Sequence, residues 1–201
     1  MIDPTTITKY DRTDAELQEL LLFTVAVAGK TAKTIAQKLD GFLKLDRSDG
    51  SPFEKIRRMA DSYCLGTNLQ EVRMGRYSVL GPCYRALATS GINLRTCSLE
   101  ELETFPGIGP KTSRFFVLHS RPKQRIAVLD THLLSYLGEL GYDVPKTTPS
   151  GKKYFEIERI FIEHADFLNR DIAELDLFVW NQRSARSGRR ETVLSSDEDG
   201  R

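Results

Sequence analysis

The segment Phe105–Ser113, with the sequence FPGIGPKTS, combines residue types that suit the binding of a phosphate group. Gly107 and Gly109 allow the backbone to turn sharply and to approach a partner closely. Pro110 favours the first position of a helix. The amides of such a helix start, and those of the turn before it, are donors that attract anions. An ordinary hairpin between two helices has the same glycine spacing, so this spacing alone leaves both interpretations open.

The distribution of charge is more informative than its sum. The formal net charge is only +1, which gives no general excess of positive charge. Between Glu103 and Asp130, however, there is no acidic residue, while this stretch contains Lys111, Arg114, Arg121, Lys123 and Arg125. A second basic zone follows Asp176. Two basic zones on a neutral body are typical of a narrow DNA-binding surface, and a solvated charged face has the same composition.

Composition excludes several other classes of protein. No stretch approaches the roughly 18 consecutive apolar residues of a membrane-spanning helix. The opening MIDPTTITKYDRTD lacks the pattern of a signal peptide, so we expect an intracellular protein, cytoplasmic or at the nucleoid. Cys64, Cys83 and Cys97 are odd in number and form no C-x-x-C pair. They indicate reduced thiols, not a disulfide framework or a zinc site.

Helix signals dominate the chain, and strand signals are nearly absent. Thr13–Glu16 has the capping-box pattern, and Ser51–Glu54 repeats it with proline at the first helical position. Asp130 suits the N-cap of a later helix. We expect helices over 17–28, 31–39, 52–66, 69–90 with a break near Gly81–Pro82, 99–105, 110–119, 131–140, 152–168 and 172–183.

These expectations define an all-α protein with a domain over residues 1–186. We expect a two-lobed multi-helix bundle with a central cleft. Residues 187–201 are polar and contain glycine and serine, which predicts a disordered tail.

The stretch from Leu102 to Thr112, with Asp130 lying 19 residues after Lys111 in Val128-Leu-Asp-Thr-His132, resembles the helix–hairpin–helix DNA glycosylase superfamily. The apolar stretch Leu21–Ala28 is similar to the helix that opens the core of that superfamily. The closing stretch 173–180, with no further domain, is most similar to the compact archaeal-type 8-oxoguanine glycosylases. The resemblance implies a helix–hairpin–helix motif between the two helices that flank Gly107.

The resemblance also implies an activity: a bifunctional DNA glycosylase and AP lyase of base excision repair. Its substrate would be double-stranded DNA with an oxidised base, 8-oxoguanine foremost. Lys111 stands where endonuclease III and the 8-oxoguanine glycosylases place a nucleophilic lysine, and Asp130 where they place an aspartate. A neutral lysine amine can attack the sugar, form a Schiff base and permit β-elimination. The carboxylate would stabilise the cationic sugar and help to deprotonate the amine.

Further residues are assigned to binding. The residues expected to contact DNA are Gly107, Ile108, Gly109, Thr112, Ser113, Arg114 and Lys30. Trp180 and Phe178 are candidates for the base pocket, because aromatic faces stack well on an extruded base. A core position suits Trp180 equally well.

The sequence departs in two respects from the pattern of many members of the superfamily it resembles. No cysteine follows Cys97, so the four-cysteine iron–sulfur cluster of many endonuclease III relatives is not expected. We expect no metal or other cofactor, with room at the hairpin for a structural monovalent cation, and a monomeric protein. Gly29-Lys30-Thr31 replaces the amide side chain with which many relatives fill the gap left by the flipped base.

Two other interpretations stay open. The same fold could act on an oxidised pyrimidine or a phage-type modified base. Alternatively, the chain could be a non-catalytic helix–hairpin–helix module that only holds the DNA backbone. A purely binding hairpin has no need for Lys111 together with Asp130, so these two residues separate the enzymatic interpretations from the binding module.

Overall fold

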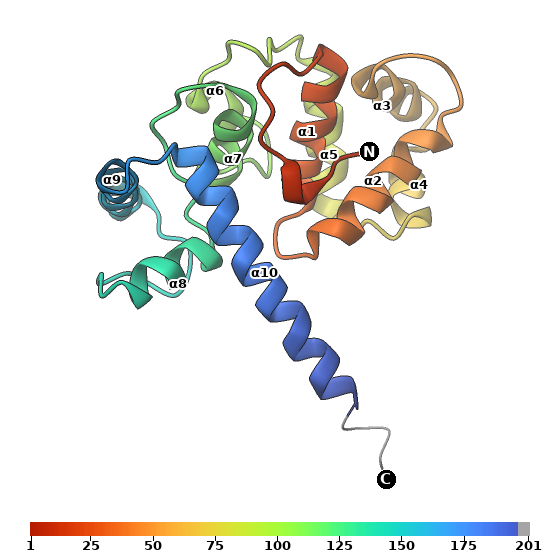
Figure 1. Cartoon of the computed structure of the whole chain (residues 1–201). Helices are drawn as coiled ribbons and strands as arrows, with labels where there is room; N and C mark the ends of the chain where they lie inside the picture. Colours follow the sequence, from red (N-terminus) through yellow and green to blue (C-terminus); the bar gives the residue numbers. More distant parts are fainter. Residues whose placement is uncertain (197–201) are drawn as a thin grey trace. The chain divides into compact units, whose positions relative to one another are not determined.

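The computed structural model describes the backbone of residues 1–196 and the side chains of residues 1–184. Residues 1–196 contain one short 3-10 helix, ten α-helices and no β-strand (Figure 1). The expectation of an all-α protein is therefore confirmed. No helix in this part of the chain is long and apolar enough to cross a membrane.

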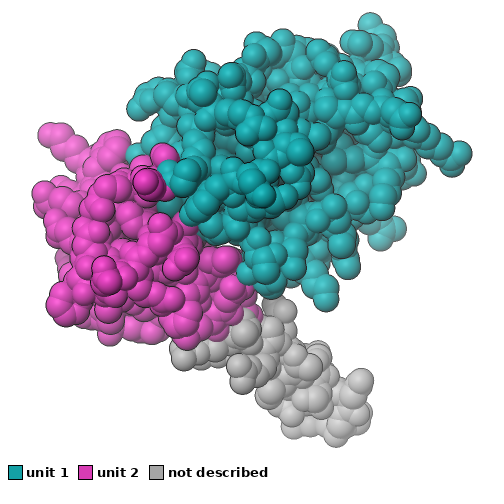
Figure 2. Space-filling model, turned by 45° about the horizontal axis from the view of Figure 1, so that its top comes forward, with its two compact units in different colours: residues 1–122 teal, residues 123–201 magenta. Residues whose placement is uncertain are grey.

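The chain divides into two compact units, Met1–Pro122 and Lys123–Arg201 (Figure 2). The first unit contains η1 (Pro4–Thr6), α1 (Asp14–Ala26), α2 (Ala32–Leu45), α3 (Pro52–Asp61), α4 (Leu65–Glu71), α5 (Tyr77–Thr89), α6 (Leu99–Glu103) and α7 (Pro110–Ser120). The second unit contains α8 (Thr131–Glu139), α9 (Gly151–Phe167) and α10 (Ile172–Ser196).

Helix α1 forms the centre of the first unit. Its capping box is present as expected, with Thr13 accepting from the Glu16 amide and Glu16 accepting from the Thr13 amide. Residues 20–26 are all buried, since α1 contacts α2, α3, α5 and α7. A helix that is apolar nearly all round is stable only in such surroundings. The buried Tyr84 hydroxyl of α5 donates to the Leu22 carbonyl of α1 at 2.9 Å.

The C-terminal end of α7 is fastened to the N-terminal segment of the chain. His119 is buried and its Nδ1 lies 2.8 Å from the Thr8 hydroxyl. Its carbonyl accepts from the Lys9 amide at 3.1 Å and from the buried Arg12 guanidinium at 2.9 Å. Burial lowers the pKa of Arg12. The helix that begins beside Lys111 is thereby fixed at its far end.

Two expected helix ends of the first unit differ by several residues from those observed. Helix α2 does not stop before Gly41 but runs to Leu45, because Leu39 and Phe42 are both buried on the same helix and outweigh one interior glycine. Helix α3 ends at Asp61 instead of continuing to residue 66, and Tyr63 follows it with a φ of +56°.

The helix expected over 69–90 is interrupted at a different place. The break lies between α4 and α5, where Arg73, Gly75 and Arg76 have φ angles of +53°, +71° and +51°. Three left-handed residues in so short a stretch cannot belong to a right-handed helix. Helix α5 then continues through Pro82. The left-handed residues, not the proline, therefore separate the two helices.

In the second unit, α10 packs against α8 and α9 (Figure 1). The backbone of α10 is helical to Ser196, so the expected helix end near Arg183 is too early. Residues 197–201 of the expected tail lie outside the described residues. The domain boundary at residues 186 and 187 stays a prediction.

Candidate active site

The hairpin between α6 and α7 is built around one glycine at which any side chain would be strained. Gly107 has a φ of +84°, and a Cβ atom there would collide with Cγ1 of Val79 in the first turn of α5. Ile108 is buried, and its amide donates to the Phe105 carbonyl at 3.1 Å. The hairpin is thus a close backbone turn that rests on α5.

Several backbone amides of the hairpin remain available. The Thr112 and Ser113 amides both donate to the Gly109 carbonyl, at 2.9 and 3.0 Å. The amides of Gly107, Gly109 and Lys111 bond to no acceptor in the part of the chain that the structure describes. Three such donors at the start of α7 are what an anionic oxygen requires.

Lys111 is the second residue of α7, directly after Pro110, and its side chain is half-buried, as is that of Thr112. The cap residue Gly109 provides no side chain to cover the helix start. Lys111 therefore lies on the helical turn that directly follows the hairpin.

The next two residues, Ser113 and Arg114, are buried and hydrogen-bonded to α6. Ser113 is fully buried and its hydroxyl donates to Glu103 Oε1 at 2.7 Å. Arg114 is 5% exposed, and its Nη1 donates to the same oxygen at 3.3 Å. These side chains join α7 to α6, and that they contact DNA stays a prediction.

Glu103 is a residue that sequence reasoning missed. It is the last residue of α6 and accepts hydrogen bonds from two side chains at the start of α7. Its carboxylate thus links α6 to α7 through side-chain hydrogen bonds, in addition to the hairpin backbone that connects the two helices. No local pattern distinguishes it from the neighbouring Glu100 and Glu101, because its partners lie on another helix.

Asp130 caps α8, as the sequence predicts. Its Oδ1 accepts from the Leu133 amide at 2.8 Å, and its carbonyl accepts from the Leu134 amide at 2.9 Å. The residue is half-buried, whereas Leu129 before it is fully buried. The carboxylate is thus held in one orientation by the helix that follows it.

The strand-like approach to Asp130 is fixed by side chains of the second unit. The Ala127 amide donates to the buried Glu158 at 2.9 Å, and its carbonyl accepts from the Tyr154 hydroxyl at 2.9 Å. The Leu129 carbonyl accepts from Thr148 at 2.8 Å. These partners come from α9 and from the loop before it. They fix the backbone that leads to Asp130. The sequence alone did not identify them.

The two candidate catalytic residues belong to different compact units. Lys111 is positioned by α6, α5 and the hairpin of the first unit. Asp130 is positioned by α8 and α9 of the second unit. That the amine and the carboxylate face each other across a central cleft stays a prediction.

The two aromatic candidates for a base pocket lie two residues apart on α10. Phe178 is 42% exposed, and the Arg170 guanidinium lies over its ring, 4.8 Å from the ring centre. The Arg170 guanidinium therefore covers one face of the Phe178 ring. Trp180 is half-buried. The role of both residues at an extruded base stays a prediction.

Lys30 lies in the loop between α1 and α2, where its Nζ donates to the Met74 carbonyl, 44 residues away. Burial, together with the nearby cations of Lys38 and Arg76, lowers the pKa of the Lys30 amine. Lys30 is thus hydrogen-bonded to the loop that separates α4 from α5. The neighbouring cations, Lys38 and Arg76, are not adjacent to it in the sequence, so the local sequence does not reveal them.

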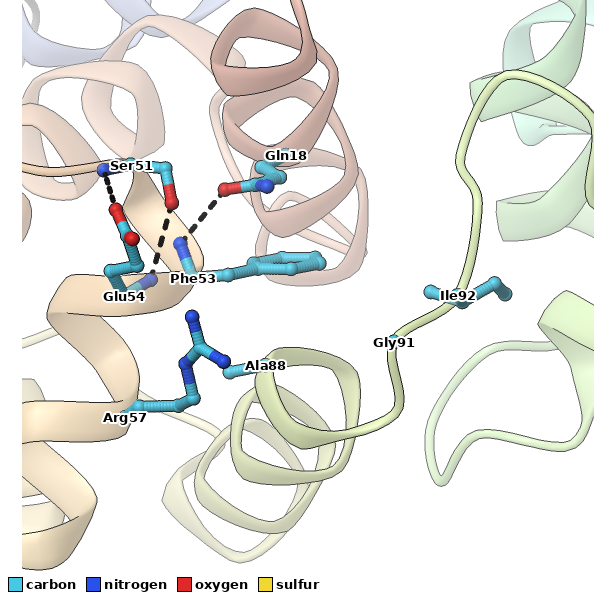
Figure 3. Close-up of a pocket in the computed structure, with 8 residues that line it drawn as sticks. All are labelled: Gln18, Ser51, Phe53, Glu54, Arg57, Ala88, Gly91 and Ile92. Atoms are coloured by element: carbon cyan, nitrogen blue, oxygen red, sulfur yellow. Dashed lines mark hydrogen bonds between the residues drawn. The ribbon is translucent and has the colours of Figure 1, made fainter.

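A separate pocket of about 320 Å³ opens on the first unit between α1, α3 and α5 (Figure 3). Ser51 and Glu54 line it but are occupied by their own capping box. Gln18 accepts from the Phe53 amide at 3.0 Å. None of the expected site residues lines this pocket, so it is not the expected base pocket.

The cysteines have structural positions. All three are free thiols, and Cys83 and Cys97 are buried. Burial raises the pKa of the Cys83 thiol to about 12 and also raises that of Cys97. These thiols therefore stay protonated and unreactive. Within the described residues, no three His, Cys, Asp or Glu side chains gather as metal ligands do.

Comparison with known proteins places this geometry in context. No family model matches the chain. The 8-oxoguanine DNA glycosylase/AP lyase of Methanocaldococcus jannaschii is 27% identical over 185 residues, covering 88% of this chain and 84% of that protein. The protein of the same name from Metallosphaera sedula is 30% identical over 87 residues, covering 43% of this chain and 42% of its own length.

Solved structures agree with these sequence comparisons. The crystal structure of the M. jannaschii 8-oxoguanine DNA glycosylase matches with a TM-score of 0.61 and 24% identity over 87% of this chain and 81% of that chain. The same enzyme in complex with a 15mer DNA containing 8-oxoguanine matches with a TM-score of 0.66 and 25% identity over 87% of this chain and 84% of that chain. The chain is thus a homologue of the archaeal 8-oxoguanine DNA glycosylase/AP lyases and has their helix–hairpin–helix fold.

Proposed function

We propose that this protein is a DNA glycosylase with AP lyase activity that removes 8-oxoguanine from double-stranded DNA. The observation that carries the proposal is the placement of Lys111 on the first turn of α7, directly after a hairpin with free backbone amides. The similarity to the M. jannaschii enzyme over 88% of the chain supports the substrate.

The hairpin would hold the DNA backbone. The amides of Gly107, Gly109 and Lys111 supply donors for a phosphate oxygen, and the positive end of the α7 dipole lies at the same place. Contacts of this kind fix the position of the strand without reading its sequence. The damaged nucleotide must leave the stack before reaction, which costs on the order of a few kcal/mol.

Lys111 would then act as the nucleophile. Its neutral amine attacks C1′ of the extruded nucleotide, the bond from C1′ to N9 breaks, and the base leaves with the bonding electrons and takes up a proton. The nitrogen lone pair then breaks the bond from C1′ to O4′, O4′ takes up a proton, and the opened sugar is linked to the lysine as a Schiff base. Loss of a proton from C2′ breaks the bond from C3′ to the 3′ phosphate, and water then releases the unsaturated sugar from the lysine.

Asp130 would stabilise the positive charge that builds on the sugar and accept a proton from the attacking amine. Its cap bond to Leu133 occupies Oδ1. A carboxylate held by a helix start keeps its position while the charge on the sugar changes, which is the arrangement that electrostatic catalysis requires. We include Trp180 in the proposed base pocket.

The remaining expectations are part of the same proposal. We propose that the enzyme works as a monomer at the cellular DNA, without an iron–sulfur cluster or other cofactor, and with room for a structural monovalent cation at the hairpin. The absence of cysteine after Cys97 supports the lack of a cluster, because such clusters require thiolate ligands.

A labelled duplex with a single 8-oxoguanine tests the proposal. Base release is detected by hot alkali and lyase activity by strand cleavage without alkali. The wild-type protein should show both, whereas Lys111→Gln should lower base release by at least about 10³-fold and abolish strand cleavage. Lys152→Gln, an exposed lysine of α9, is the matched control and should cleave as the wild type does.

A panel of duplexes with other oxidised bases decides the substrate. Preferential cleavage of 8-oxoguanine supports the proposal. Faster cleavage at an oxidised pyrimidine would identify that base as the substrate and would leave the proposed lysine mechanism unchanged. Binding without cleavage of any lesion would contradict the enzymatic proposal and favour a non-catalytic DNA-binding module.

A further inference from the structure

The guanidinium of Arg183 on α10 is hydrogen-bonded to two side chains of α8. Its Nη1 and Nη2 donate to Oε1 and Oε2 of Glu139, at 3.1 and 2.6 Å, and Nη1 also donates to the Ser135 hydroxyl at 2.8 Å. The guanidinium carbon lies over the Tyr136 ring, 5.9 Å from its centre. Positions 135, 136 and 139 have the spacing of one helix face. One side chain of α10 thus holds one face of α8.

The pair of Arg183 and Glu139 differs from an ordinary surface ion pair. A guanidinium and a carboxylate that share two parallel hydrogen bonds have one defined geometry. The Arg183 side chain is 13% exposed, whereas the side chains of Arg159 and Glu163, a pair within α9, are 75% and 68% exposed. Exposed pairs of the second kind contribute little. The Arg183 pair is therefore suited to fixing the position of α8.

The remaining contacts of α8 leave its orientation less well defined. Leu133, Leu134 and Leu137 are buried, and apolar packing of this kind is non-directional. The Tyr136 hydroxyl lies 2.8 Å from Nε2 of His164 on α9. Hydrogen bonds are directional, so the polar contacts to α9 and α10 select one rotation of α8 about its own axis.

The orientation of α8 decides where the Asp130 carboxylate lies. Asp130 is the N-cap and Glu139 the last residue of this nine-residue helix. Because Oδ1 of Asp130 accepts from the Leu133 amide, the carboxylate moves with the helix when the helix moves. A displacement of about 1 Å at a reacting group can cost on the order of 100-fold in rate.

We propose that Arg183 is a positioning residue for the removal of the base. Through Glu139 and Ser135 it sets the orientation of α8, and thereby directs the Asp130 carboxylate at the sugar on which positive charge builds. The inference rests on the proposed function. In this role Arg183 touches no reacting atom and acts only through Asp130.

Two variants that break the pair from opposite sides test the proposal. Arg183→Gln and Glu139→Gln are compared with the wild type in single-turnover release of 8-oxoguanine at saturating protein. Both should lower the rate on the order of 10- to 100-fold, because the carboxylate is displaced from the sugar. The Kd for the lesion duplex should stay at the wild-type value in both variants.

A duplex with a preformed abasic site separates positioning from a general loosening of the fold. Its sugar already presents an aldehyde to the lysine, so no base has to leave. Strand cleavage of this duplex should therefore fall much less than base release in both variants. An equal loss of the two activities would overturn the proposal, and so would wild-type rates of base release in both variants.

Glu139→Gln also separates positioning from a direct contact between Arg183 and DNA. If Arg183 bound a phosphate group, Arg183→Gln would raise the Kd, whereas Glu139→Gln would free the guanidinium and would not. That result would overturn the proposal. Arg183→Lys should recover only part of the rate of base release, because an ammonium group cannot form two parallel hydrogen bonds with a carboxylate.

Arg159→Gln is the matched control, since it removes a paired arginine from the same compact unit. It should release 8-oxoguanine at the wild-type rate. All variants are compared at a temperature at which their thermal unfolding curves show a fully folded protein. A loss of rate in Arg159→Gln equal to that in Arg183→Gln would contradict a specific role for Arg183.

Failure of the proposed function would have a different signature. A wild-type protein that released no base from any lesion would refute the proposed function, and the positioning role with it. An active wild type whose rate survived the loss of either partner of the pair would refute the positioning role alone.

Discussion

Asp130 combines two tasks that different substitutions can separate. As an N-cap it accepts the Leu133 amide, and as a proposed catalytic carboxylate it supplies negative charge. The first task needs only an oxygen acceptor, whereas the second needs the ionised group. A residue that serves both is fixed in space by its structural role, which is an advantage for the chemical one.

Asp130→Asn should lose activity while keeping the fold. Asparagine caps helices about as well as aspartate, so the free energy of unfolding should change by less than about 0.5 kcal/mol. The rate of 8-oxoguanine release should fall on the order of 100-fold or more, because the charge is gone. Urea unfolding and single-turnover kinetics measure the two effects.

Asp130→Ala is the companion variant, since it removes the cap as well. It should also destabilise the protein by about 0.5–2 kcal/mol. An Asp130→Asn enzyme with wild-type rates would show that the carboxylate has no chemical task. An Asp130→Asn variant as unstable as Asp130→Ala would contradict the expectation that asparagine replaces the cap.

Substitution of Gly107 should lower the stability of the hairpin for two structural reasons. In Gly107→Ala the new methyl group meets Val79, and the φ of +84° is unfavourable for alanine. We expect a loss of about 1–3 kcal/mol in stability and weaker binding of DNA. Thermal unfolding and anisotropy measure both quantities.

The double variant Gly107→Ala/Val79→Ala relieves the collision but not the backbone strain. It should therefore recover part of the stability lost in Gly107→Ala, relative to Val79→Ala alone. Complete additivity of the two substitutions would contradict the contact between the hairpin and α5.

At the scale of elements, Glu103 links α6 to α7. Glu103→Ala removes one acceptor of Ser113 and one acceptor of the buried Arg114, so stability should fall by about 1–3 kcal/mol. Ser113→Ala removes one hydroxyl donor, which the Glu103 carboxylate and the Pro110 carbonyl share, and should cost about 1 kcal/mol. Chemical denaturation compares the two variants. A Glu103→Ala protein as stable as the wild type would show that the hairpin does not depend on this link.

The start of α1 predicts a specific response to acid. The hydrogen bond from Lys9, followed by that from the Thr13 amide, lowers the pKa of Glu16 to about 2. Because this pKa is lower in the folded than in the unfolded protein, the stabilising effect is complete above about pH 4.5 and is lost as the pH falls toward 2. The side chain is 41% exposed, so solvent screening limits the effect to less than about 1 kcal/mol.

Glu16→Gln tests this response, since glutamine can still complete the capping box. Unfolding free energies at several pH values between 6 and 2 should fall less steeply for Glu16→Gln than for the wild type. Glu71→Gln, an exposed carboxylate at the end of α4, is the control. Parallel curves for wild type and Glu16→Gln would contradict the role of this carboxylate.

The sequence predicted those features of the helices that depend on residues close together in the chain. The capping box at Thr13 and the cap at Asp130 are both present, because a cap depends on residues three positions away. The break after α4 was misplaced, because three left-handed residues held by distant lysines leave no trace in composition. Pro82, a strong local signal, was overruled by the packing of α5 against α1 and α3.

At the scale of the whole molecule, the resemblance that a short motif suggested extends over most of the chain. The sequence around Lys111 and Asp130 resembles the helix–hairpin–helix DNA glycosylase superfamily, and the similarity to the M. jannaschii 8-oxoguanine DNA glycosylase/AP lyase extends over 88% of this chain. The surroundings of these residues could not be predicted in the same way. Glu103, Tyr154 and Glu158 act through contacts between helices, and contacts of this kind are set by tertiary packing alone.

Whole-molecule organisation also assigns the two reactive groups to separate compact units, each with its own supports. The proposed reaction therefore depends on one residue from each unit. A substitution that loosens either support, such as Glu103→Ala or Tyr154→Phe, should affect chemistry through position, without removing a reactive group.

The identity of the nucleophile tests the whole account most directly. Wild-type protein is incubated with a duplex containing 8-oxoguanine in the presence of borohydride, which reduces a Schiff base to a stable amine, and the linked peptide is mapped by mass spectrometry. We predict a single adduct on Lys111 that is absent from Lys111→Gln. An adduct on another lysine, or cleavage of the lesion with no adduct at all, would contradict it.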